Sequence, residues 1–145
     1  LLEDTRAMVR ELGLENDVIF VGFRNDVKNL YYGSDLYINP SEQEACSFVI
    51  LESLASGLPV IATDVGGTGD IINDENNCGL LVKYDDPEDM AQAMKRLIED
   101  RELLEKLKTN AQKTIREKHN TAKMVEQTYR YYLEFARKED WARKS

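Results

Sequence analysis

Short apolar runs alternate with stretches of helical periodicity through the first half of the chain. The runs that predict buried strands lie at residues 18–21, 36–38, 59–63 and 79–82. Apolar residues spaced three and four apart predict helices at residues 2–12, at 27–31 after a capping Asp26, and at about 47–56. Gly13 and Gly57 stand where a glycine usually ends a helix.

Beyond Pro87 the pattern becomes almost wholly helical. Pro87 suits a first helical turn, and Met90, Met94 and Leu97 form one apolar face of the helix that follows. A second face runs through residues 103–115, and a last helix begins near Met124 and continues as far as Trp141. The chain therefore divides into an α/β part, residues 1–86, and C-terminal helices, residues 87–145.

Strands that alternate with helices predict an α/β fold: a doubly wound, Rossmann-like parallel sheet covered by helices on both faces, here with a helical C-terminal tail. Such sheets bind their ligands beyond the carboxyl ends of the strands. We therefore expect the site in the loops that follow Val21, Ile38 and Thr63.

Composition and charge narrow the function classes. The chain has 145 residues, of which 42% are hydrophobic and 32% charged, and this excludes a disordered, collagen-like or disulfide-scaffold protein. A net charge of −8 argues against binding to nucleic acid. Residues 1–80 carry 4 Lys/Arg against 14 Asp/Glu, a net charge of −10, so an anionic ligand there needs another source of positive potential.

The cysteine usage and the hydropathy indicate a compartment. Cys46 and Cys78 alone do not make a disulfide framework and suit a reducing cytoplasm. The apolar runs are far shorter than the ~20 residues that cross a bilayer. We expect a cytoplasmic protein.

The loop from Asn39 to Ser47 leads directly into the helix expected at 47–56. Small residues before a helix leave backbone N–H groups free, and the positive end of the helix dipole adds to their potential. A phosphate can bind there without a basic side chain. The alternative is that Ser47 is simply the N-cap of this helix.

Two carboxylates are candidates for ligand contacts. Glu52 is the only charged residue between Ala45 and Thr63, so it either accepts hydrogen bonds from ribose hydroxyls or belongs to a solvent-facing stripe. Glu44 precedes it by eight positions, about 12 Å along a helix, which suits two contacts along one ligand better than a glycosidase pair. The alternative for Glu44 is an exposed acid.

These motifs together resemble a known family. Pro40-Ser41, Glu44, seven residues, Glu52, the run from Gly57 to Thr63 and then Gly66-Gly67 resemble the retaining GT-B glycosyltransferases of family 4, the glycosyl transferases group 1. The resemblance runs from Leu1 to about Tyr132 and matches the C-terminal, donor-binding domain of that family.

The resemblance implies a function and a role for each matching residue. The chain would bind a nucleotide-sugar donor for sugar transfer, with Glu44 as the catalytic residue at the hydroxyls of the transferred sugar. Glu52 would bind the ribose. The other donor-binding residues implied are Phe23 and Arg24 near the base, and Ser41, Ala45, Cys46, Ser47 and Phe48 around the sugar and pyrophosphate. The nucleotide sugar is a substrate, and neither a cofactor nor a metal is expected. Catalysis would stabilise the departing nucleoside diphosphate, with retention by front-face transfer.

The chain departs from the family at two places. Ala45-Cys46-Ser47 stands where the family usually has Gly-Phe-Gly, and these side chains are expected to narrow the space for the sugar. Gly69-Asp70 replaces a usual Pro-Glu pair and is expected to make its loop more flexible. His119, the only histidine, is expected at a solvated helix end.

The resemblance also implies an incomplete domain. With a strand order of 3-2-1-4-5-6, two strands would belong between residues 18–21 and 36–38, so the chain is expected to lack the first two strands of the GT-B half. It would also lack the acceptor-binding domain, its partner and its only route to peripheral membrane association. We expect no transferase activity from this chain alone. The alternatives are a non-catalytic nucleotide-sugar-binding domain and a GT-B nucleotide-sugar epimerase.

Overall fold

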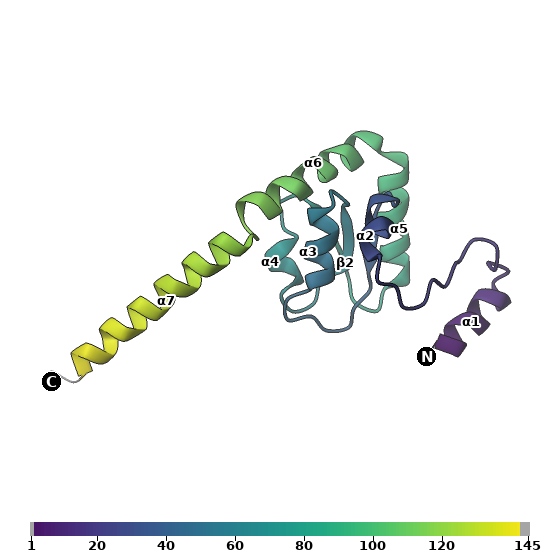
Figure 1. Ribbon diagram of the computed structural model, residues 1–145. Coiled ribbons are helices and arrows are strands. Elements are labelled where there is room, and N and C mark those ends of the chain that lie inside the picture. Colours follow the sequence, from purple (N-terminus) through teal and green to yellow (C-terminus); the bar gives the residue numbers. More distant parts are fainter. Residues whose placement is uncertain (1, 143–145) are drawn as a thin grey trace.

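The centre of the molecule is a small parallel sheet, described here from a computed structural model (Figure 1). The structure describes residues 2–142, with side chains to residue 136. Its strands are β1 (Tyr37–Asn39), β2 (Val60–Thr63) and β3 (Gly79–Val82), in the spatial order β1-β2-β3. Tyr37 pairs with Val60 in one ladder, and Val60 pairs with Gly79 in the other.

Seven helices are assigned within residues 2–142. They are α1 (Leu2–Glu11), α2 (Val27–Tyr32), α3 (Phe48–Ala55), α4 (Thr68–Ile71), α5 (Pro87–Glu99), α6 (Arg101–Glu117) and α7 (Thr121–Ala142). The α/β class and the parallel sheet predicted from the sequence are confirmed, and α7 includes Trp141 as expected.

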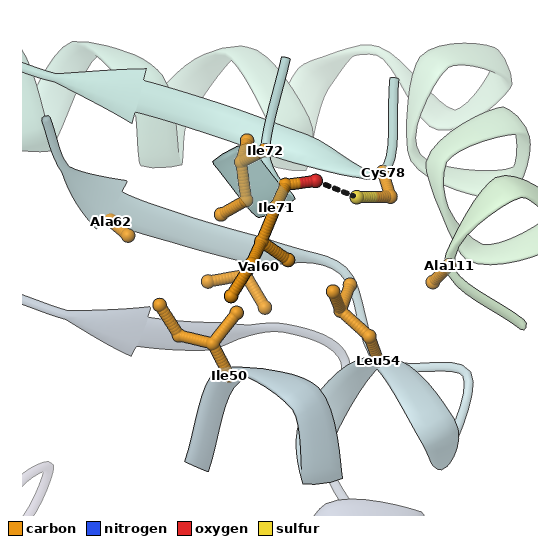
Figure 2. Packing of buried hydrophobic residues seen from close by; sticks show 8 residues of the cluster. All are labelled: Ile50, Leu54, Val60, Ala62, Ile71, Ile72, Cys78 and Ala111. Atoms are coloured by element: carbon orange, nitrogen blue, oxygen red, sulfur yellow. Dashed lines mark hydrogen bonds between the residues drawn. The ribbon is translucent and has the colours of Figure 1, made fainter. Parts of the chain in front are cut away.

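The alternation of side chains along β2 divides the core in two. Val60 and Ala62 point to one face and meet Ile50 and Leu54 of α3, as Figure 2 shows, whereas Ile61 packs on the other face with Leu97 of α5. Helix α6 reaches both groups, through Ala111 on the first face and through Leu104 and Leu107 on the second. All four residues of β2 are buried, so this strand is the centre of the fold.

Helix ends follow local chemistry. Asp86 accepts a hydrogen bond from Asp89 N at 3.0 Å and Asp100 accepts one from Leu103 N at 2.9 Å, which caps α5 and α6. Gly57, at φ +80°, ends α3 as expected. The expected capping by Asp26 is wrong in its chemistry: α2 begins after Asp26, but the Asp26 carboxylate makes no cap hydrogen bond and binds Arg24.

The predicted strand at residues 18–21 is wrong. This segment forms no ladder, and Ile19 is 80% exposed. A strand satisfies its backbone N–H and C=O groups through a neighbouring strand, and none of the described residues pairs with this run. Its apolar side chains are therefore uncovered in the structure.

Helix α4 and His119 also differ from the sequence predictions. Helix α4, four residues long, was not expected; it includes Gly69 and Asp70, so this segment is a helical turn rather than an open loop. His119 follows the end of α6, but it is partly buried rather than solvated. Burial and the neighbouring Lys118 charge both lower the pKa of His119.

Candidate functional site

The loop that follows β1 lies at the carboxyl end of the sheet and leads into α3. Thr63, at the end of β2, donates a hydrogen bond to the Ser41 carbonyl at 2.5 Å and so ties the loop to the neighbouring strand. The carboxyl ends of parallel strands share one edge, which is the usual ligand-binding edge of such sheets. The loop thus stands where the sequence predicts the site.

The Glu44 carboxylate is held by three side chains. Its Oε1 accepts hydrogen bonds from Ser41 Oγ at 2.9 Å, from Ser47 Oγ at 3.1 Å and from Asn39 Nδ2 at 3.2 Å. Hydrogen bonds from Asn39, Ser41 and Ser47 lower the pKa of Glu44, while partial burial opposes them. Glu44 is therefore an oriented carboxylate that is ionised at neutral pH.

The Gly66-Gly67 turn supports this loop from behind. Gly67 N donates to the Glu44 carbonyl at 3.1 Å. A Cβ on Gly66 would lie 1.8 Å from that same carbonyl oxygen, and one on Gly67 would lie 2.2 Å from the Ala45 carbonyl oxygen. Gly66 also has a φ of +51°, a conformation that favours glycine. Both glycines are needed for the close approach of the two loops.

The N-terminus of α3 has no side-chain cap from the described residues. Ser47 occupies the N-cap position, but its hydroxyl binds Glu44 and makes no capping hydrogen bond. The first N–H groups of any α-helix lack intrahelical acceptors, so those of Phe48 and Val49 are open to a ligand. Phe48 is 74% exposed and Val49 is 40% exposed. The interpretation of Ser47 as an ordinary N-cap is therefore wrong for its side chain.

Glu52 lies one turn further along α3, beside a cleft between α2 and α3. The cleft has a volume of about 740 Å³, and its wall includes Asn25, Asp26, Tyr31, Glu52 and Ser56. Tyr31 Oη donates to Glu52 Oε2 at 3.4 Å. Burial, followed by the charge of Glu52, raises the pKa of Tyr31. The cleft is within the size range of small-molecule sites.

Two tyrosines pack against each other near Glu52. Tyr31 and Tyr37 meet edge to face, with ring centroids 5.9 Å apart. Burial raises the pKa of Tyr37, and the charges of Glu44 and Glu52 raise it further. The negative charges of both carboxylates therefore act on the Tyr37 phenol.

The predicted site residues do not all come together. The structure joins Ser41, Glu44 and Ser47 in one hydrogen-bonded group, with exposed Ala45 and Cys46 on the same loop and Phe48 at its end. Ser47 is 3% exposed and turned inward, so its side chain does not narrow the space outside the loop as the sequence suggested.

Phe23 and Arg24, the residues expected near the nucleotide base, lie outside the hydrogen-bonded group around Glu44. Phe23 is 94% exposed and is not part of the cleft wall. Arg24 makes a two-point ion pair with Asp26, at 2.8 and 2.5 Å, and these hydrogen bonds lower the pKa of Asp26. Arg24 therefore touches the cleft through Asp26.

Sequence reasoning missed Asn39, Tyr31 and Tyr37. A signal existed for Asn39, since it is a polar residue at the carboxyl end of a short strand. No signal existed for Tyr31, which reaches Glu52 across 21 positions.

Neither a metal-binding cluster nor a membrane-spanning helix is found in the described part of the chain. Among the side chains that the structure describes, those of residues 2–136, no three of His, Cys, Asp or Glu gather in a way that could hold a metal ion. None of the helices in the described part of the chain is long and apolar enough to cross a membrane.

The fold and the site define a class of protein: the C-terminal, Rossmann-like half of a GT-B glycosyltransferase. The family described as "Glycosyl transferases group 1" matches residues 2–114, and the chain belongs to this family. An uncharacterized glycosyltransferase of Methanocaldococcus jannaschii is 34% identical over 84% of this chain and 32% of its own length. The N-acetyl-alpha-D-glucosaminyl L-malate synthase of Bacillus anthracis is 32% identical over 90% of this chain and 34% of its own length.

A solved structure agrees with the sequence relatives. Anabaena HepE in complex with UDP superposes with a TM-score of 0.85 and 26% identity, over 92% of this chain and 36% of HepE. HepE has also been solved with UDP-glucose, and that structure gives a TM-score of 0.83. The chain spans about a third of the length of the curated relatives it matches.

Proposed function

We propose that this chain is the donor-binding half of a retaining, family 4 glycosyltransferase, which transfers a sugar from a nucleotide-sugar donor to an acceptor bound elsewhere. One observation carries the proposal: an oriented, ionised Glu44 stands beside the open first turn of α3, and Glu52 follows on the same helix at a cleft of nucleoside size. The complexes of HepE with UDP and UDP-glucose support a donor of this kind.

The donor would lie along α3, from its first turn to the cleft. Glu44 would accept hydrogen bonds from hydroxyls of the transferred sugar, and the N–H groups of Phe48 and Val49 would meet the diphosphate. Glu52 would accept hydrogen bonds from the ribose, and the base would lie near Arg24.

The chemistry follows from these contacts. Amides held in place at a helix N-terminus stabilise the negative charge that grows on the departing diphosphate. Glu44 keeps the sugar in position as the bond between the sugar and the diphosphate breaks. The acceptor hydroxyl attacks from the same face and gives its proton to the departing diphosphate, so the configuration is retained. The proposed chemistry draws on no metal ion or cofactor.

The rest of the protein would supply what these residues do not. The net charge of −10 over residues 1–80 makes it a poor source of cations for a diphosphate, so we assign those cations to a further segment of the protein. The uncovered apolar run at 18–21 supports two further strands beside it, and the acceptor would bind a second domain. Alone, the chain would be inactive. Two free cysteines support a cytoplasmic location.

The test uses the natural protein that contains this chain. Glu52→Ala should weaken the binding of UDP or another nucleoside diphosphate about 10- to 100-fold, since a hydrogen bond to a charged group contributes about 1.5–3 kcal/mol. Glu44→Ala should reduce turnover while nucleotide binding persists. Glu99→Ala, on the exposed end of α5, is the control and should change neither. Normal kinetics in both site variants would refute the assignment. Donor binding with no turnover in the wild type would favour the non-catalytic domain, and conversion of the donor sugar without an acceptor would favour an epimerase.

A further inference from the structure

The hydrogen bonds of the Glu44 carboxylate are distributed unequally. All three bonds that this side chain receives from described residues end on Oε1, and Oε2 receives none from that part of the protein. Glu44 also lines an open hollow of about 390 Å³ with Gln43, Ala45, Val65 and Gly66. One oxygen is thus held by the protein, and the other remains available.

The orientation of the Asn39 amide follows from its neighbours. Asn39 is 6% exposed, and its Nδ2 lies 3.2 Å from Glu44 Oε1 and 3.3 Å from Ser47 Oγ, while its Oδ1 lies 2.6 Å from Ser41 Oγ. An ionised carboxylate only accepts hydrogen bonds, so the NH₂ group must face Glu44. Both amide protons and the amide oxygen then have partners, and a flipped amide would set two acceptors against each other.

The Ser47 hydroxyl links the oriented Asn39 amide to Glu44. Its hydroxyl accepts from Asn39 and donates its single proton to Glu44 Oε1 at 3.1 Å. Ser41 also has one proton, shared between Asn39 Oδ1 and Glu44 Oε1. Asn39 and Ser47 are the two buried members of this group, whereas Ser41 is only partly buried.

We propose that Asn39 and Ser47 are positioning residues that hold Oε1 of Glu44, so that Oε2 is the oxygen presented to the sugar of the donor. The sugar contact rests on the proposed function, but the hold on Oε1 does not. The role also accounts for Ser47: a residue that caps a helix would use its hydroxyl on α3, and this one uses it on Glu44.

Neighbouring charges do not explain how the Glu44 carboxylate is held in place. Glu42 lines the same hollow, and burial, with the charges of Glu44 and Glu52 as smaller causes, raises the pKa of Tyr37. The Val65 and Gly66 backbone opposite brings no charge, and no basic side chain contributes to the lowered pKa of Glu44. Removal of either neutral donor, Asn39 or Ser47, should therefore change the pKa of the Glu44 carboxyl group directly.

The first experiment is a ¹³C carboxyl NMR titration of this chain. Asn39→Ala should raise the pKa of Glu44 by about one unit, and Ser47→Ala should raise it by less. Asn110→Ala is the matched control, since Asn110 is a partly buried amide that donates to the Asn77 carbonyl at 2.9 Å, and it should leave Glu44 unchanged. An unchanged Glu44 in both site variants would overturn the hold on Oε1. If Asn39→Ala does not fold, Ser47→Ala removes one oxygen only and decides the matter.

The second experiment measures binding of UDP and UDP-glucose to the natural protein by calorimetry. Asn39→Ala and Ser47→Ala should each weaken UDP-glucose about 3- to 10-fold and leave UDP unchanged. In a Glu44→Ala background the same substitutions should cost nothing further. Equal losses for the two ligands, or full losses without Glu44, would reveal a merely structural role and overturn the proposal. A wild type that binds neither these probes nor any other nucleoside diphosphate would count against the proposed function, and the titration would still decide the hold on Oε1.

Discussion

Two regions of this molecule each contain a short apolar run, and only one of the two runs forms a strand. The N-terminal arm, residues 2–23, and the sheet body, residues 37–118, each contain an apolar run typical of a buried strand. In the body, Val60–Thr63 is β2, with neighbours on both sides. In the arm, residues 18–21 are more apolar and form no strand, and α1 buries none of its residues. Figure 1 shows α1 apart from the sheet and its helices.

The difference shows that a strand depends on its neighbours more than on its own hydrophobicity. The arm has internal contacts, such as Arg6 over the Phe20 ring at 5.5 Å and the turn at Gly13. However, none of the described residues forms a ladder with its apolar run. The body gains two ladders and two apolar layers around β2. Three pairs of substitutions can break or sharpen this comparison.

The largest effect is expected from shortening isoleucines in the two runs. Ile61→Ala, at a fully buried position of β2, should lower the free energy of unfolding by about 2–5 kcal/mol because it leaves a cavity. Ile19→Ala in the arm should change it by less than about 0.5 kcal/mol. Urea denaturation followed by circular dichroism measures both, and equal losses would mean that the arm packs as tightly as the body.

A second comparison uses two glycines with a positive φ. Gly66→Ala should cost about 2–4 kcal/mol, since its Cβ meets the Glu44 carbonyl in addition to the strained φ of +51°. Gly22→Ala, with a φ of +62° and open space around it, should cost only about 1 kcal/mol. The same denaturation assay applies, and a Gly66→Ala protein as stable as Gly22→Ala would contradict the close packing of the two loops.

The smallest effect tests a defect inside the body. Thr68 Oγ1 is buried without a hydrogen-bond partner among the described residues. Thr68→Val keeps the shape and removes this hydroxyl, so it should raise the free energy of unfolding by about 1 kcal/mol. Thr63→Val is the control, because the buried Thr63 hydroxyl donates to the Ser41 carbonyl at 2.5 Å, and it should not stabilise the protein. A rise in both variants would mean that the effect is not specific to the unpaired oxygen.

Local chemistry made most of the body predictable. Gly57 ends α3, Pro87 begins α5, and the apolar spacing identifies both helices. Helix α4 was missed because four residues are too few to show a period. The strand at 18–21 was wrong because a pattern of apolar residues does not say whether a neighbouring strand is present.

The site also combines residues that the sequence could indicate with residues that only the fold brings together. Ser41, Glu44 and Ser47 lie within six positions of one another, so one loop brings them together and the sequence could indicate them. Tyr31 reaches Glu52 only because α2 packs near α3, and Gly66 reaches Glu44 only because two loops meet at the sheet edge. The base-site assignment of Phe23 and Arg24 stays a prediction.

The sequence by itself determined the strands of the body, its helices apart from α4, the carboxylate loop and the family to which the chain belongs, because each depends on residues that are close along the chain. Only the tertiary structure decided that residues 18–21 stay unpaired, that Asn39 and Ser47 hold one oxygen of Glu44, and that Ser47 leaves α3 uncapped. The physical reason is that a strand needs a neighbouring strand and a hydrogen-bond donor needs an acceptor. The tertiary fold determines which of several candidate partners lies within reach.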